Sequence, residues 1–201
     1  MKYLPNYNLW WPDFEHEPEL GMVRIVKCMT DCDVVLPFVR TKGVALQAGG
    51  HIGLWARQLA RHFAFVYTFE PVPDMYECLH LNVQGYPNII PRQSALGATD
   101  GVINVEPRNG GRSTVSSSDL SIPVKMEAVD SMKLIRCDLM YLDVERYELE
   151  ILKGAAETIE KFRPVIVMEV LGKQQEAVRE WADKNKYSLV KQTHSDWIFT
   201  P

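Results

Sequence analysis

The chain has 201 residues and a formal net charge of −4, and 46% of its residues are hydrophobic. This length suits one domain with a sizeable core, and the charge lacks the polycationic signature of a nucleic-acid binder, so we expect no nucleic-acid partner. No run approaches the roughly 18 apolar residues of a membrane span, and the start lacks a signal-peptide pattern, so we expect a cytoplasmic protein without a membrane partner.

The cysteines give no sign of a metal site. Cys28 and Cys32 lie four positions apart, but no second close cysteine or histidine pair completes a zinc site. We therefore expect free, partly buried thiols and no metal.

Residues 1–42 form an irregular N-terminal extension, punctuated by prolines. One short helix is predicted there, capped by Asp31 and running through Val39, because its apolar positions share one side. A second region, residues 43–201, has the pattern of a folded domain.

From residue 43 strands and helices alternate. The apolar run 44–46 and the β-branched and aromatic run 64–69 predict buried strands, and a third strand begins at Asn88. Apolar residues at helical spacing predict helices over 52–63 and 73–85. This alternation indicates βαβ units with a parallel sheet.

The second half resumes this rhythm after a polar interruption. Short strands are predicted at 102–105 and 122–126, on either side of a glycine- and serine-rich segment, 108–121, that we interpret as a surface loop. The elements predicted beyond it are a strand at 139–142, a helix at 147–162, a strand at 164–170, a helix at 173–186, and strands at 187–190 and 197–199. The last two strands are close enough in sequence to form an antiparallel hairpin.

A glycine-rich turn follows the first of these strands. It reads Gln47-Ala48-Gly49-Gly50-His51-Ile52-Gly53, and glycines there permit a tight turn and let backbone approach a ligand. Glu70 ends the next strand, 17 residues after Gly53, where a carboxylate can accept both hydroxyls of a ribose. Together these features predict a nucleoside cofactor, without separating S-adenosylmethionine from NAD.

Acidic residues follow the strand at 139–142. Asp143 stands at its carboxyl end, where open α/β sheets bind ligands. Glu145 and Glu148 lie in the loop and first helical turn that follow. For Glu148 a role in stabilising the helix N-terminus explains the residue as well as a functional role does.

The order of these motifs resembles the FkbM family of methyltransferases, over roughly residues 43–200. The segments that carry the resemblance are 44–53, Phe69-Glu70-Pro71, Ser94-Ala95-Leu96-Gly97, 142–148, Leu152-Lys153-Gly154-Ala155 and 164–169. The resemblance implies a Rossmann-like class I methyltransferase fold: α/β, with a seven-stranded, mostly parallel sheet, helices on both faces and a C-terminal antiparallel hairpin. It also implies methyl transfer from S-adenosylmethionine to oxygen, on a saccharide or another small metabolite.

The resemblance also implies roles for individual residues. Those expected to bind the cofactor are Gln47, Gly49, Gly50, His51 and Gly53 at its methionine end, Glu70 at the ribose, Pro71, Val72, Ser94 and Ala95 around the adenine, and Asp143 near the transferred methyl. Separately from the resemblance, the candidates for the base that deprotonates the acceptor are Asp143, Glu145 and Glu169, because each falls at or just beyond the carboxyl end of a predicted strand. His194 is a fourth candidate, although a surface position explains it better. Position along the chain does not choose among them.

Two regions outside the cofactor motifs are expected to shape the acceptor site, namely residues 1–42 and the loop 108–121. Residues 1–42 would cover it, while residues 43–201 form the methyltransferase domain. Arg112, in the glycine- and serine-rich segment, is placed to contact an anionic acceptor.

Departures from the family pattern leave two alternatives open. Gln47 replaces the usual aspartate, Arg146 the usual glycine and His51 the usual asparagine. The first two changes fit a catalytically weak or inactive cofactor-binding protein. The glycine turn and Glu70, taken alone, also fit an NAD-dependent oxidoreductase, although the C-terminal hairpin argues against it.

Overall fold

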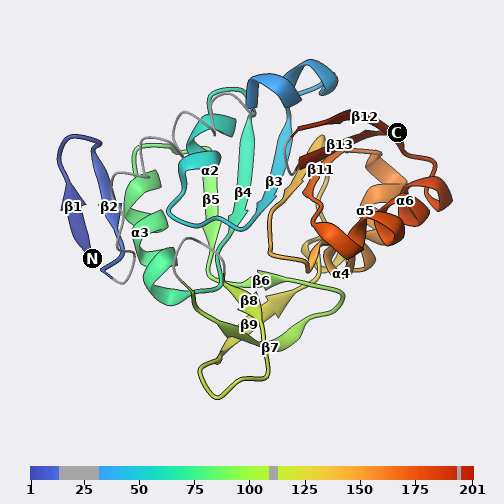
Figure 1. Ribbon diagram of the computed structural model, residues 1–201. Helices are drawn as coiled ribbons and strands as arrows, with labels where there is room; N and C mark the ends of the chain where they lie inside the picture. Colours follow the sequence, from blue (N-terminus) through green and yellow to red (C-terminus); the bar gives the residue numbers. More distant parts are fainter. Residues whose placement is uncertain (14–31, 109–112, 194–195) are drawn as a thin grey trace.

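The computed structural model describes residues 1–13, 32–108, 113–193 and 196–201. Its centre is a seven-stranded sheet in the order β12-β13-β11-β10-β3-β4-β5 (Figure 1). The strands are β3 Val44–Ala48, β4 Phe65–Phe69, β5 Ile89–Arg92, β10 Leu139–Leu142, β11 Val165–Glu169, β12 Ser188–Gln192 and β13 Asp196–Thr200. Neighbours from β11 to β5 pair in parallel, and β13 runs antiparallel to both of its neighbours. The predicted mostly parallel sheet with a C-terminal hairpin is confirmed.

Helices cover both faces of the sheet. On one face α2 (Leu54–Leu59) and α3 (Pro73–Val83) pack against alternate strand residues such as Ala45 and Tyr141. On the other, α4 (Glu148–Lys153), α5 (Ala156–Phe162) and α6 (Gln175–Lys184) pack against their neighbours Leu46 and Met140. The central strands β3 and β10 are buried along their whole length because helices cover both faces, and most of their residues are apolar.

The prediction of one helix over 147–162 is wrong, since α4 ends at Lys153 and α5 begins at Ala156. At Gly154 the backbone lies directly against Gly97, and a Cβ at position 154 would clash with the carbonyl oxygen of Gly97. Asp130 then caps the new helix, its two carboxylate oxygens accepting hydrogen bonds from the backbone N–H groups of Glu157 and Thr158, each at 2.9 Å. Apolar periodicity continues through the break, so it did not reveal these long-range contacts.

The polar middle of the chain is more ordered than predicted. The expected strands are β7 (Gly101–Glu106) and β9 (Ile122–Glu127), which pair antiparallel. Two short strands, β6 (Ala95–Leu96) and β8 (Thr114–Val115), extend them into a second sheet in the order β6-β9-β7-β8, below the central sheet in Figure 1. Strand β8 falls inside the segment predicted to be a loop. Arg112 lies outside the described residues.

The N-terminal region also contains a hairpin that the sequence did not predict, formed by β1 (Lys2–Leu4) and β2 (Leu9–Trp11) beside α3. Asn82 of α3 anchors it: its side chain accepts a hydrogen bond from the Trp10 N–H at 2.6 Å and donates to the carbonyls of Trp10 and Ile52, each at 2.9 Å. Asn82 therefore ties both the hairpin and the glycine-rich turn to α3.

The predicted short helix appears as helical residues 32–35 followed by the 3-10 turn η1 (Leu36–Phe38). Val35 and Val39 are buried against the central sheet, as the pattern indicated. Its expected cap, Asp31, and Cys28 lie outside the described residues, whereas Cys32, Cys78 and Cys137 are buried. No helix in the described ranges is long and apolar enough to cross a membrane.

Candidate active site

A cleft opens where β3, β4 and β10 end, at the carboxyl edge of the sheet. Its lining comes from the glycine turn (Ala48, Gly49, His51), the end of β4 (Phe69, Glu70, Pro71), Met75 of α3, Ser94, Ala95 and Leu96, Val105, Ser113, Thr114 and Val115 of the small sheet, and Asp143, Val144, Glu145 and Tyr147 after β10. Parallel strands end at the same edge, so motifs far apart in sequence meet here.

The glycine turn is held against the loop that follows β10. Gly49 has φ +84°, and a Cβ there would clash with the carbonyl oxygen of Asp143. The N–H groups of Gly49 and Gly50 donate to the Phe69 carbonyl at 3.1 and 2.7 Å. Glycine is therefore required at position 49 by its conformation and by the close approach of backbone.

Only two of the five residues expected at the methionine end line the cleft, namely Gly49 and His51. The other three support the turn from behind. The buried Gln47 amide donates to the Gly49 carbonyl at 2.6 Å and accepts a hydrogen bond from the Thr68 hydroxyl. Gly50 packs on Leu79 and Thr68, and Gly53, with φ +88°, packs on Val83.

Glu70 joins the turn to the end of β4. Its carboxylate accepts hydrogen bonds from the His51 N–H at 2.8 Å and the Val72 N–H at 2.9 Å, one on each oxygen. Burial raises the pKa of Glu70 to about 7, although these two N–H groups act to lower it. Each oxygen keeps a lone pair for a further donor, such as a ribose hydroxyl. Pro71 lines the cleft beside it, while Val72 is buried outside the lining.

Ser94 and Ala95 face the same cleft from the approach to the small sheet. The buried Ser94 hydroxyl donates to Glu127 at 2.7 Å, and Glu127 forms ion pairs with Lys125 and Arg92 at 3.2 and 3.4 Å. Ser94 is thus held by the small sheet, with its side chain already hydrogen-bonded.

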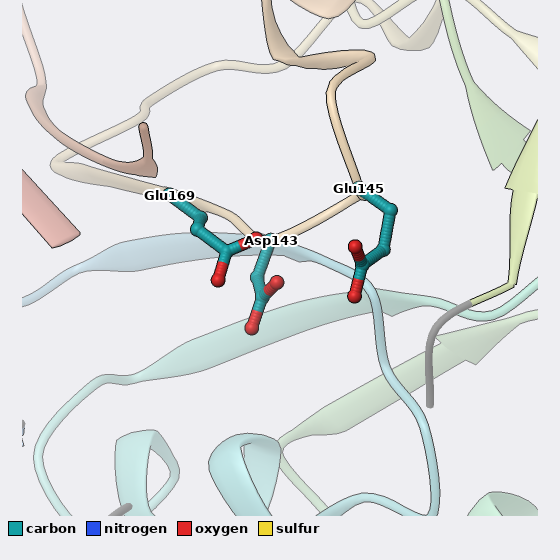
Figure 2. Close-up of side chains that lie close together, drawn as sticks. All are labelled: Asp143, Glu145 and Glu169. Carbon is teal, nitrogen blue, oxygen red and sulfur yellow. The ribbon is translucent and has the colours of Figure 1, made fainter. Parts of the chain in front are cut away.

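The three candidate bases lie together. Asp143, Glu145 and Glu169 each offer a carboxylate oxygen within 4.8 Å of the others, and all three are half-buried. Figure 2 shows Glu169 reaching toward Asp143 from the end of β11, with Glu145 on the other side of Asp143. The parallel register that pairs Leu142 with Met168 puts Asp143 and Glu169 next to each other. We call these three residues the carboxylate cluster.

The carboxylate cluster has two chemical capacities. It can take a proton from a bound hydroxyl, or its oxygens can contact a cation, since carboxylates are the ligands that hard divalent ions prefer. Acidic groups also gather without a metal, and the expectation of no metal stays a prediction. His194, the fourth candidate base, lies outside the described residues.

The sequence indicated that the 108–121 segment shapes the acceptor site, but it did not reveal that part of this segment is a strand, nor that Tyr147 lines the cleft. Ser113, Thr114 and Val115 reach it through the pairing of β8 with β7, a contact between segments that no local pattern marks. Tyr147 was assigned only as the start of a helix. Arg146, in contrast, is exposed and does not line the cleft, and its φ of +79° is a conformation that favours glycine.

Comparison with known proteins gives consistent matches. The family model described as methyltransferase FkbM domain matches residues 47–189. The hexuronic acid methyltransferase AglP of Haloferax volcanii is 32% identical over 111 residues, which are 52% of this chain and 46% of that protein. The aligned part thus spans about half the length of this curated relative.

Solved structures show the same fold. A methyltransferase FkbM from Methylobacillus flagellatus superposes with a TM-score of 0.62 at 14% identity, over 80% of this chain and 44% of that one. Magnesium protoporphyrin IX methyltransferase of Synechocystis, solved with bound S-adenosylmethionine, superposes with a TM-score of 0.53 at 15% identity, over 93% and 84% of the two chains. The predicted class I methyltransferase fold is confirmed.

Proposed function

The chain belongs to the methyltransferase FkbM domain family, and from this premise we propose that it transfers a methyl group from S-adenosylmethionine to a hydroxyl oxygen of a saccharide or similar small metabolite. The observation that carries the proposal is one cleft that joins Glu70 and the glycine turn to Asp143 and Glu145. One side of the cleft suits a nucleoside, and the other suits deprotonation of a hydroxyl.

The residues of the glycine turn and β4 fit the cofactor. The missing Cβ of Gly49 lets the Asp143 carbonyl oxygen lie against the glycine turn, and Gly49 itself lines the cleft. The buried Glu70 carboxylate can accept the two ribose hydroxyls, and Pro71, Ser94 and Ala95 form apolar and polar walls beside it. S-adenosylmethionine supplies an electrophilic methyl group on a positively charged sulfur.

The carboxylate cluster would act on the acceptor. As the acceptor oxygen forms its bond to the methyl carbon and the carbon–sulfur bond breaks, the hydroxyl proton passes to a carboxylate. We assign this base to Asp143, because the backbone of Asp143 lies against Gly49 in the cofactor turn. Glu145 and Glu169 add negative charge within 4.8 Å, which favours the cationic cofactor and a proton held on Asp143.

A saccharide acceptor is supported by the relative that methylates a hexuronic acid. A panel of uronic acids, neutral sugars and small polyols, assayed for transfer of a tritiated methyl group, tests the acceptor class. A thermal-shift comparison of S-adenosylhomocysteine with NAD tests the cofactor, because a ligand that binds the folded protein raises its melting temperature. Binding of S-adenosylhomocysteine without transfer to any acceptor would favour the alternative of a cofactor-binding protein that lacks activity.

Affinity for S-adenosylhomocysteine is expected to rise as pH increases from about 6 to about 8. The pKa of Glu70 is raised from 4.5 to about 7, so the folded protein holds this proton more tightly than the unfolded chain. The protonated Glu70 side chain therefore contributes its full share of the folding stability below about pH 4.5, and this share is lost as pH rises through 7.

The same proton affects cofactor binding. Ribose hydroxyls donate to the ionised form of Glu70, so below pH 7 binding must release the proton. Calorimetry in buffers of different ionisation enthalpy measures this proton release. If the affinity of the wild type for S-adenosylhomocysteine does not change with pH and equals that of Glu70→Gln, the expected pH dependence is wrong.

The small sheet is expected to select the acceptor. Thr114 lines the cleft, so Thr114→Trp should lower kcat/KM for the acceptor by about tenfold or more, or roughly 1.4 kcal/mol, and change S-adenosylhomocysteine affinity by less than about threefold. Ser117→Trp, at an exposed position of the same segment, is the matched control and should behave as wild type. If Thr114→Trp and Ser117→Trp have the same kcat/KM for the acceptor, the segment that contains Thr114 does not form part of the acceptor site.

A further inference from the structure

Glu148 is a buried carboxylate close to the active site that does not reach the cleft. It begins α4, its side chain is 1% exposed, and it is absent from the residues that line the cleft. Burial raises its pKa. The mechanism above gives it no contact with either reactant, so its hydrogen bonds indicate what it does.

One oxygen of Glu148 holds the loop after β10. Its Oε1 accepts hydrogen bonds from the Val144 N–H at 3.2 Å and the Arg146 N–H at 3.3 Å. These two amides flank Glu145, a member of the carboxylate cluster. Glu145 and Arg146 both have positive φ, at +53° and +79°, a backbone conformation that residues other than glycine adopt rarely. The Glu148 carboxylate therefore fixes a loop conformation that the sequence alone disfavours.

The other oxygen of Glu148 reaches the segment after β11. Its Oε2 accepts a hydrogen bond from the Gln174 side-chain amide at 3.1 Å. Gln174 ends the 3-10 turn η4 (Gly172–Gln174), five residues beyond Glu169. A single buried carboxylate thus joins the two segments that carry the carboxylate cluster.

We propose that Glu148 is a positioning residue, which keeps Asp143 and Glu145 close to Glu169. It does so by binding the backbone N–H groups of Val144 and Arg146 on one side and the turn after β11 on the other. This role rests on the proposed function, in which the carboxylate cluster serves the acceptor. It requires the reach and the acceptor oxygens of the side chain, and it does not require its negative charge.

Two conservative variants separate reach from charge. In Glu148→Gln the amide oxygen still accepts from Val144 and Arg146, and the new NH2 group can donate to Gln174 once that side-chain amide rotates. The Gln174 Oε1 atom is buried and has no hydrogen-bond partner among the described residues, so it is available to accept. Glu148→Asp keeps the charge but is one methylene group shorter, so it cannot bind both segments.

The expected result is that Glu148→Gln keeps kcat within about threefold of wild type, while Glu148→Asp loses tenfold or more, up to the roughly 10²-fold cost of a 1 Å misplacement. Amide hydrogen exchange over residues 143–147 should increase in Glu148→Asp and not in Glu148→Gln. Glu150→Asp and Glu150→Gln, on the same helix, are matched controls and should leave kcat unchanged. Assays are run well below the melting temperature of each variant.

A Glu148→Gln variant that is no more active than Glu148→Asp overturns the proposal. A wild-type protein without methyl transfer to any acceptor would instead contradict the proposed function. The exchange comparison does not depend on turnover and would still decide whether Glu148 fixes the loop: equal exchange in the two variants overturns it.

Discussion

The Asp143→Asn variant is expected to melt close to the wild-type temperature while methyl transfer falls roughly 10²-fold or more, the usual scale for a lost general base. Asparagine keeps the size and shape of the side chain but cannot take a proton from the acceptor. The backbone contacts are preserved, including the Asp143 N–H that donates to the Ala48 carbonyl at 3.2 Å. The N-cap of α4 is Tyr147 and has no side-chain cap hydrogen bond, so the substitution removes no helix cap.

Single-turnover rates for Asp143→Asn, Glu145→Gln and Glu169→Gln, each measured with saturating cofactor, identify the base. Near-normal turnover in Asp143→Asn would remove this residue from the catalytic assignment and leave Glu145 and Glu169. The same assay with EDTA and with added Mg²⁺ distinguishes a carboxylate base from a bound cation. Turnover that does not change on chelation is the expected result, and loss that Mg²⁺ restores would show that the carboxylate cluster holds a metal.

The Glu70→Gln variant is expected to bind S-adenosylhomocysteine roughly ten- to a hundredfold more weakly. A hydrogen bond to a charged group contributes about 1.5–3 kcal/mol, and the ribose hydroxyls would lose such an acceptor. The substitution also affects the glycine turn, because each Glu70 oxygen accepts a backbone N–H, from His51 and from Val72. In glutamine the NH2 group must face one of these donors, so the melting temperature should fall as well.

Isothermal titration calorimetry at about pH 8, where Glu70 is ionised, measures this loss. Glu77→Gln is the matched control, since Glu77 is exposed on α3 and does not line the cleft. Unchanged affinity in Glu70→Gln would remove Glu70 from the cofactor site.

Local patterns were enough to predict the central sheet. The apolar runs at 44–46 and 139–142 become fully buried strands, and the terminal hairpin follows from the short interval between its strands. The division into α4 and α5 was not predictable, since it arises where Gly154 meets Gly97 and where Asp130 supplies a cap. Strand β8 was missed for the same reason, because its two residues are ordered by pairing with β7.

The candidate site was predictable as a set of residues but not as a geometry. Asp143, Glu145 and Glu169 were singled out because each falls at or just beyond the carboxyl end of a strand. Their approach to within 4.8 Å depends on β10 and β11 being neighbours, and chain order alone does not fix which strands are adjacent. The division of the glycine turn into lining and supporting residues likewise depends on where Thr68, Leu79 and Val83 pack.

The contact between Gly49 and the Asp143 carbonyl means that the two halves of the cleft are not mechanically separate. A larger residue at position 49 would displace the loop that carries Asp143 and Glu145, so it should change the Michaelis constant for the acceptor as well as that for the cofactor. In a double-mutant cycle, substitutions in the turn and in the loop should therefore show a coupling energy, since residues in direct contact rarely give additive effects. Which substitutions the glycine turn tolerates then depends on the acceptor reaction as well as on cofactor binding, although no side chain of the turn has to touch the acceptor.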